Sequence, residues 1–221
     1  MKLGRLSDLQ TRILQLLAGV EPKWTLSGGG ALAGFHLCHR TTRDLDLFWH
    51  GAVGLGPQVE DCIGRLRDAG LAVDVLQRSR SFVRLSATDG QERTVLDLVA
   101  EPVAVVEAPV PMPVGEATVL VDTADEILVN QLGALLNRAE ARDLLDLQLL
   151  LAQDADLARA MQGAAQKDGG FSPLTLGWML ASFPVGRQAS AAGMDEATGA
   201  ELDRFRLELA RRVAALAAPD G

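Results

Sequence analysis

The chain is poor in residue types that mark several protein classes. It has two cysteines in 221 residues, Cys38 and Cys62, whereas a disulfide framework in a chain of this size normally uses more. We therefore expect buried free thiols. Its three histidines form no Cys/His cluster with the spacing of a zinc site. The sequence predicts neither a disulfide scaffold nor a zinc protein.

Long apolar runs are also missing. No stretch reaches the roughly 18 uninterrupted apolar residues of a membrane span. The N-terminus "MKLGRLSDLQTR" lacks the apolar region of a signal peptide. These absences predict a cytoplasmic protein that has no membrane association.

Basic residues are outnumbered, with 21 Lys and Arg against 29 Asp and Glu and a formal net charge of −8. This balance argues against broad electrostatic coating of a nucleic acid, so a nucleic-acid partner needs a local basic patch. Four arginines are candidates for such a patch: Arg78, Arg80, Arg84 and Arg93. They could line one surface. They could equally be scattered, because their positions in the predicted strands have mixed parity.

Apolar residues are plentiful, and 48% hydrophobic content is ample for a buried core. The tryptophans at 24, 49 and 178 each sit in an apolar segment. We therefore expect them to pack in the core rather than to stack on a base.

The first half of the chain alternates helix and strand signals. Helical spacing of leucines predicts a helix over 6–17, and a second helix is predicted over 57–70. Between them, "KWTLSGG" and "RDLDLFW" predict strands on either side of a brief helix. Three strand-like runs follow, and Asp89-Gly90 predicts a hairpin between the last two. A mixed sheet with flanking helices is expected.

The second half has a helical pattern. The proline-rich "EPVAVVEAPVPMPVG" is unsuited to a helix or a central strand, which places the domain boundary near Gly115. Beyond it, helices are predicted in "DTADEILVNQLGALLNR" and over 140–152, 154–166, 173–182 and 196–217. The predicted fold class is α/β (α+β), with a sheet domain over 1–115 and a helical domain over 116–221.

The stretch "LSGGGALAGFHLCHRTTRDLDLFW" combines three glycines with a later Asp-x-Asp. Residues two apart in a strand point to the same face, so Asp44 and Asp46 present their carboxylates together. Mg²⁺ prefers oxygen ligands and often combines one or two carboxylates with substrate phosphates. An isolated Asp-x-Asp is more often a solvated strand face, so this pair gains meaning only from its surroundings.

A further carboxylate, Asp97, lies among apolar strand residues in "TVLDLVA". Because an unpaired buried charge is costly, a cation should lie beside it, and Arg93 or Arg84 is an ordinary structural partner. If its strand neighbours that of Asp44 and Asp46, three carboxylates converge. That arrangement has room for two metal ions about 3.5–4 Å apart.

The glycines complete this constellation. Gly28 and Gly29 lack a Cβ, so the backbone there can approach a polyphosphate closely and adopt a positive φ. The short helix that follows would direct its N-terminal amides at the phosphates. A lone triple glycine is more often a simple turn, but glycines and aspartates in this order favour a metal–phosphate site.

This pattern resembles the nucleotidyltransferase superfamily that includes DNA polymerase β. Its signature is an apolar residue, Gly-Gly or Gly-Ser, about a dozen residues, and Asp-x-Asp or Asp-x-Glu. More narrowly, "LSGGGALAGFHLCHRTTRDLDLF" with "EILVNQLGALLNRAEARDLLDLQLLL" resembles the AbiEii/AbiGii-type nucleotidyltransferase toxin family. The resemblance extends over roughly residues 24–150.

The resemblance implies roles for the first block. Gly28 and Gly29 would contact a triphosphate, and Asp44 and Asp46 would hold Mg²⁺. Asp97 would be the third acidic residue, acting as a metal ligand or helping to deprotonate the attacking hydroxyl.

Arg40 belongs to a His-Arg pair that matches the family's characteristic dipeptide. By the resemblance it would bind the nucleotide and neutralise phosphate charge. An ion pair with Asp44 or Asp46 is the alternative role of this arginine.

The second block departs from the family, which usually has a nucleotide-contacting lysine at the position of Gln131. Arg138 or Arg142 would compensate for that lysine, or would instead form salt bridges to Asp143 or Asp146.

The implied activity is that of an Mg²⁺-dependent nucleotidyltransferase, which moves a nucleoside monophosphate from an NTP to a hydroxyl of an RNA, such as the 3′ end of tRNA, or of a protein. Such enzymes commonly act as toxins and imply an antitoxin protein as partner. The alternative, suggested by Gln131, is a weakly active or inactive relative that binds a nucleotide or a partner protein.

Overall fold

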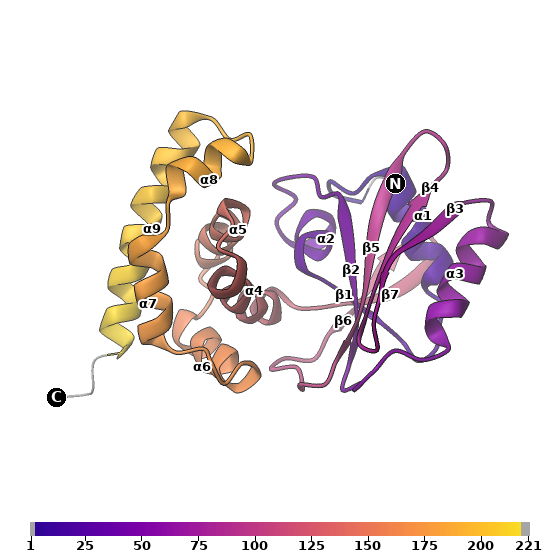
Figure 1. Ribbon diagram of the computed structural model, residues 1–221, viewed down its shortest axis with the longest axis horizontal. Coiled ribbons are helices and arrows are strands. Elements are labelled where there is room, and N and C mark those ends of the chain that lie inside the picture. The colour runs from indigo at the N-terminus through magenta and orange to yellow at the C-terminus, as the bar shows by residue number, and fades with distance from the viewer. Residues whose placement is uncertain (1–2, 218–221) are drawn as a thin grey trace. The chain divides into compact units, whose positions relative to one another are not determined.

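The computed structural model describes residues 3–217 and divides the chain into two compact units, one ending at Thr123 and the other beginning at Ala124. The predicted fold class is confirmed, because the first unit holds a mixed sheet with helices and the second unit, as far as it is described, consists of helices (Figure 1). Gly115 lies in the turn of a hairpin that pairs with the sheet. The units therefore divide further along the chain than the expected boundary.

The first unit contains seven strands and four helical segments among its described residues. In chain order these elements are α1 (Asp8–Leu17), β1 (Thr25–Ser27), α2 (Gly28–Ala31), η1 (Leu32–His36), β2 (Asp44–His50), α3 (Gln58–Asp68), β3 (Ala72–Arg78), β4 (Phe82–Thr88), β5 (Arg93–Glu101), β6 (Val110–Val114) and β7 (Ala117–Val121).

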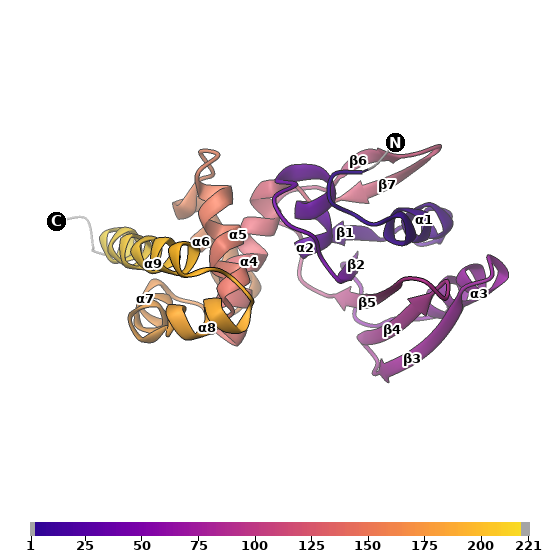
Figure 2. The ribbon, with the colours of Figure 1, turned by 90° about the horizontal axis from the view of Figure 1, so that it is seen from above.

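The strands form one sheet with the order β3-β4-β5-β2-β1-β7-β6. Strand β2 runs parallel to β5, and β1 runs parallel to β7, while the remaining neighbours are antiparallel. Helices α1 and α3 lie on the same side of the sheet (Figure 2). The predicted hairpin at Asp89-Gly90 is confirmed, since Thr88 pairs with Arg93 across it.

Strand β2 separates the core from the polar face by strict alternation. Leu45, Leu47 and Trp49 are buried, whereas Asp44, Asp46 and the following alternate residues are half-buried. Because successive strand residues point to opposite faces, burying the leucines fixes both aspartates on the face away from the core.

The second unit contains helices whose bounds agree closely with the sequence pattern. They are α4 (Ala124–Arg138), α5 (Ala141–Leu151), α6 (Leu157–Lys167), α7 (Pro173–Ser182), α8 (Val185–Ala191) and α9 (Glu196–Ala217). Short α8 was not predicted.

Lys167 of α6 donates to the fully buried Glu126 of α4 and to Asn130 Oδ1. This contact neutralises a carboxylate that is costly to bury alone.

The tryptophan prediction is confirmed at two positions and wrong at the third. Trp24 and Trp49 are buried, and each indole N–H donates to a backbone carbonyl at 2.8 Å. Trp178 is 76% exposed. Helix α7 buries Met179 and Leu180 on its inner side, which leaves Trp178 on the outer one.

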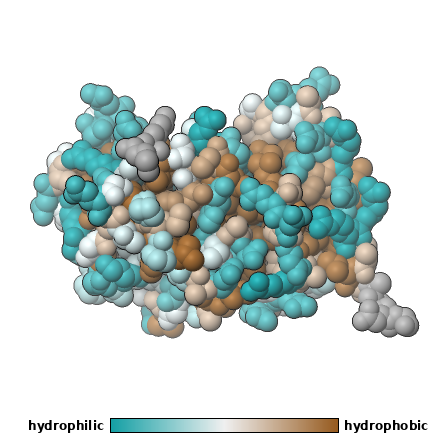
Figure 3. Space-filling view, turned by 180° about the vertical axis from the view of Figure 1, so that it is seen from behind, coloured by the Kyte–Doolittle hydropathy of each residue, from teal (hydrophilic) through white to brown (hydrophobic). Residues whose placement is uncertain are grey.

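The surface drawn in Figure 3 intersperses hydrophilic and hydrophobic side chains. Within residues 3–217, no helix combines the length and the apolar composition that crossing a membrane requires.

Both cysteines are free thiols, as predicted, although only Cys62 is buried and Cys38 is half-buried. Burial, with a smaller contribution from the charge of Asp61, raises the pKa of the Cys62 thiol to about 12. Since the thiolate is the reactive form, Cys62 stays protonated and inert far below that pH.

We expect iodoacetamide at pH 8 to modify the folded protein at Cys38 and to spare Cys62, as peptide mass spectrometry would show. Equal labelling of both thiols in the folded chain would contradict this.

Candidate active site

The chain leaves β1 through a turn that only glycine fits. Gly28 has φ +56°, and a Cβ built there would lie 2.6 Å from Oδ2 of Asp46. Glycine tolerates both the backbone conformation and the close approach, because it has no side chain. The turn therefore places bare backbone directly against one of the two predicted catalytic carboxylates.

The next glycine lies beside the segment that leads into β2. A Cβ at Gly29 would come within 3.2 Å of Thr42 Oγ1 and 3.3 Å of Arg40 Nη2. The structure thus gathers Gly28, Gly29 and Arg40 at one end of β2. Arg40 Nη1 donates to the carbonyl of Thr41 at 3.4 Å, so the guanidinium is held close to the glycine turn.

Asp44 is oriented by a residue that the sequence interpretation missed. The hydroxyl of Thr42 donates to Asp44 Oδ1 at 2.5 Å. Thr42 precedes Asp44 by two positions, and extending the period-two pattern by one step places its side chain on the same face as the aspartates. This alternation in the sequence could have identified Thr42 as a neighbour of Asp44.

Asp97 lies on the strand next to the one that carries Asp44 and Asp46. In the sheet register Asp46 of β2 is level with Asp97 of β5, and Asp97 is level with Arg84 of β4. Neighbouring strands are about 4.7–4.9 Å apart, so the Asp46 and Asp97 backbones are adjacent. Asp97 is only 6% exposed. Register therefore places Asp97 beside Asp46, although the two residues are remote in sequence.

Arg84 neutralises Asp97 through two parallel hydrogen bonds. Its Nε donates to Oδ1 at 2.7 Å and its Nη2 to Oδ2 at 2.6 Å. Of the two arginines suggested by the sequence, Arg84 is thus the partner of Asp97. The hydrogen bond to Asp97 raises the pKa of Arg84, and the charges of Asp97, Asp44 and Asp46 raise it further. The guanidinium therefore interacts with all three carboxylates.

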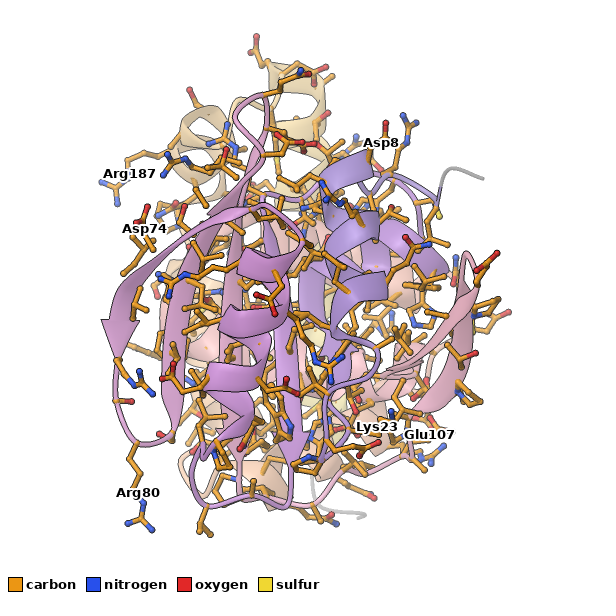
Figure 4. All side chains as sticks on the ribbon, turned by 90° about the vertical axis from the view of Figure 1, so that its right-hand side faces the viewer. Asp8, Lys23, Asp74, Arg80, Glu107 and Arg187 are labelled. Carbon is orange, nitrogen blue, oxygen red and sulfur yellow. The ribbon has the colours of Figure 1, made fainter. Side chains whose placement is uncertain are left out.

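The four arginines considered as a basic patch have different partners, although Arg84 and Arg93 share one face of the sheet. Arg78 pairs with Glu60 of α3 at 2.8 Å, and Arg93 donates to Ser86 Oγ at 3.1 Å. Arg80 projects outward from the molecule (Figure 4). Only Arg84 among them contacts the acidic site.

The donor set suits a single hard cation. Asp44 and Asp46 offer carboxylate oxygens from one face of β2, and the absent side chain of Gly28 lets the backbone approach Asp46 Oδ2 closely. Oxygen donors of this kind are what Mg²⁺ prefers. Among residues 3–217, however, no three His, Cys, Asp or Glu side chains gather as a metal cluster. The role of Asp97 as a metal ligand stays a prediction, and both its oxygens accept hydrogen bonds from Arg84.

Two histidines converge on Asp122, just after β7. Nε2 of His36 is 2.8 Å from the Asp122 carbonyl oxygen, and Nε2 of His50 is 3.2 Å from its Oδ1. Asp122 is fully buried. These contacts tie the end of β2 to the segment that follows β7, which helps to fix the strand that carries the aspartates.

Gln131 belongs to the second unit and is held within it. It lies on α4, is 4% exposed, and donates through Nε2 to Oδ2 of the fully buried Asp146 at 3.2 Å. The side chain that stands in place of the family's usual lysine thus satisfies a buried carboxylate.

Comparison with known proteins gives the family and the fold of the chain. A family model described as the nucleotidyl transferase AbiEii toxin of a type IV toxin–antitoxin system matches residues 12–215. The chain belongs to this family. Among solved structures, MenT4, a nucleotidyltransferase toxin from Mycobacterium tuberculosis H37Rv, aligns with TM-score 0.63 and 18% identity, covering 94% of this chain and 86% of that one. JHP933 from Helicobacter pylori aligns with TM-score 0.51 and 22% identity, covering 96% of both chains. These two similarities concern the fold, and no curated protein matches the chain significantly.

Membership of the AbiEii family identifies the chain as a nucleotidyltransferase toxin by family. It also gives weight to the departure at Gln131, for which two arginines were considered as substitutes. Arg138 makes two hydrogen bonds to Asp143, at 2.9 and 2.6 Å, and Arg142 pairs with Glu140 at 3.0 Å. Both guanidinium groups therefore form salt bridges within the helical unit, and Arg138 does so with one of the two partners expected from the sequence.

Proposed function

We propose that this AbiEii protein is an Mg²⁺-dependent nucleotidyltransferase. It moves a nucleoside monophosphate from an NTP to a hydroxyl of an RNA, such as the 3′ end of tRNA, or of a protein. The observation that carries the proposal is the placement of Asp44 and Asp46 on one face of β2, with the bare backbone of Gly28 against Asp46. As a toxin it would act against its own cell and be neutralised by an antitoxin.

Each residue has a part in this reaction. Asp44 and Asp46 hold the metal, and Gly28 and Gly29 bind the triphosphate. Bound Mg²⁺ supplies positive charge to the oxygens of the transferring and leaving phosphates. Arg40 lies beside Gly29 and adds further charge for phosphate binding. The polar face of β2 is thus the nucleotide-binding surface.

Asp97 is the residue to which we assign the proton transfer. It takes the proton of the acceptor hydroxyl while the hydroxyl oxygen bonds to the α-phosphorus and the bond to the leaving pyrophosphate breaks. Arg84 fixes the carboxylate of Asp97 through its two hydrogen bonds. The products are a nucleotidylated acceptor and pyrophosphate.

The direct test is label transfer. Purified protein is incubated with each α-labelled NTP and Mg²⁺, together with total RNA, purified tRNA or lysate protein. We expect label to appear on one acceptor class and to require Mg²⁺. A folded sample that labels no acceptor under any of these conditions overturns the proposal.

An inactive nucleotide-binding or partner-binding relative is the second candidate. The buried Gln131, in place of the family's usual lysine, favours it. Calorimetry with an NTP, followed by a pyrophosphate assay, separates the two candidates. Mg²⁺-dependent binding with no pyrophosphate, in the presence of RNA and protein acceptors, supports this second function.

The antitoxin is tested by growth. Induced expression of the chain is expected to arrest growth, and co-expression of the neighbouring reading frame to restore it. Arrest that persists with an Asp46→Asn variant would show that the growth defect does not come from nucleotidyl transfer.

Thr42→Ala should lower the rate of transfer by about 10- to 100-fold, because a hydrogen bond to a charged group is worth roughly 1.5–3 kcal/mol. Removing the Thr42 hydroxyl frees the Asp44 carboxylate to rotate away from its binding orientation. Thr42→Ser keeps the hydroxyl and should retain most of the activity. Equal rates for the Ala and Ser variants would show that this hydrogen bond does not position Asp44.

A further inference from the structure

The Arg84–Asp97 pair lies beside Asp46, where the hypothesis of three converging carboxylates would put a second metal ion. Asp97 is level with Asp46 on the neighbouring strand, and Arg84 is level with Asp97 on the strand beyond. The three side chains therefore form one row across β2, β5 and β4 on the polar face of the sheet.

Both oxygens of Asp97 are engaged by this arginine. The contacts of 2.7 and 2.6 Å form a bidentate, charge-assisted pair, which is the strongest arrangement of a guanidinium and a carboxylate. Asp97 is almost fully buried, so Arg84 also offsets the cost of burying the charge. A metal ion at Asp97 would need to share the carboxylate with a permanent positive charge that repels it.

We propose that Arg84 is the resident cation of this site and takes the place of a second metal ion. The chain then binds one divalent ion with its nucleotide, on Asp44 and Asp46, while Asp97 stays outside the metal shell. This inference rests on the proposed metal–nucleotide site and adds its stoichiometry. Arg84 is a positioning residue, since it acts through Asp97.

The test counts ions without any turnover. Mn²⁺ is titrated into equimolar protein and a non-hydrolysable NTP analogue, and free Mn²⁺ is followed by electron paramagnetic resonance. The wild-type chain is expected to bind about one Mn²⁺, and the Arg84→Gln variant, with Asp97 released, about two. Two ions on the wild-type chain, or one on a folded Arg84→Gln chain, would overturn the proposal.

Two further variants make the result specific. Arg93→Gln removes a nearby arginine that contacts Ser86 rather than Asp97, and it should leave the count at one. Arg84→Gln combined with Asp97→Asn should also bind one ion, because the liberated carboxylate is gone. A second ion in either variant would show that Asp97 is not the added ligand.

A second variant covers the case in which Arg84→Gln is unstable. If Arg84→Gln does not fold, Arg84→Lys keeps a positive charge but lacks the two-pronged geometry. In Arg84→Lys the second ion should bind at least about tenfold more tightly than in the wild-type chain. An unchanged affinity for the second ion would contradict the proposal.

Failure of this inference and failure of the proposed function are distinguishable. If the wild-type chain transfers label and binds two ions, the one-ion stoichiometry is wrong and the proposed function is supported. If it binds one ion and transfers no label, the stoichiometry is supported and the proposed function is wrong. A wild-type chain that binds no ion with the nucleotide analogue would refute both.

Discussion

Replacing Asp46 by asparagine is expected to lower nucleotidyl transfer by at least about 10³-fold, because under the proposed function Asp46 is a charged metal ligand at the point where phosphate charge must be stabilised. Asn has nearly the same size and shape, so the fold should survive. Asp46 is also the carboxylate that touches the Gly28 backbone and is level with Asp97, so it links all parts of the site. Initial rates of label transfer at saturating NTP measure the effect.

Asp74→Asn provides the matched control. Asp74 is an exposed residue of β3, at the edge of the same sheet, and it projects outward (Figure 4). This variant loses one negative charge without touching the site, so its rate should equal that of the wild type. If the label-transfer rate of Asp46→Asn is within tenfold of the Asp74→Asn rate, Asp46 is not required for nucleotidyl transfer.

Gly28→Ala should disable the enzyme almost as severely, with a loss of at least about 10²-fold, since small displacements of reacting groups have effects of this size. The added methyl group would collide with Asp46 Oδ2, which lies 2.6 Å from the Cβ position. The left-handed backbone at φ +56° adds about 1–2 kcal/mol of destabilisation. Label transfer and urea unfolding together measure both effects.

Gly70→Ala separates backbone strain from collision. Gly70 has φ +84° at the end of α3, and a Cβ there meets nothing within 4 Å. Its alanine variant should lose a comparable free energy of unfolding and keep full activity. If both variants lose activity equally, general destabilisation rather than contact with Asp46 explains the loss.

The polar face of β2 could be predicted because it depends on local pattern alone. Alternation fixes Asp44 and Asp46 on the side opposite Leu45 and Leu47, whatever the rest of the fold does. The same argument, extended by two residues, would have found Thr42. Helix bounds over 173–182 and 196–217 were equally local, since apolar period and end signals define them.

The neighbours of Asp97 could not be predicted, because strand order and register are non-local. Arg84 lies directly across from Asp97 on the antiparallel strand, whereas Arg93 lies four residues earlier on the same strand, level with Thr88. Both were equal candidates in the sequence, and only register separates them. The pairing of β2 with β5 is likewise a contact between distant segments.

Composition alone did not reveal that the proline-rich segment forms an edge strand or that Trp178 is exposed. The proline-rich segment before Gly115 is unsuited to a central strand, but β6 lies at the sheet edge, where Pro111 and Pro113 are tolerated. This hairpin belongs to the first compact unit, which ends at Thr123. Trp178 lies in an apolar stretch, yet a helix buries only one side, and the apolar composition of α7 hides which side that is.

The metal–nucleotide site on Asp44 and Asp46 can be tested by one titration. A non-hydrolysable NTP analogue is titrated into the wild-type chain and into an Asp44→Ala, Asp46→Ala double variant, each with and without Mg²⁺. We expect calorimetry to detect tight binding only to the wild-type chain with Mg²⁺, and binding at least about 100-fold weaker in the other three combinations. Binding of equal strength without Mg²⁺, or to the folded double variant, would contradict a metal–nucleotide site built on these two aspartates.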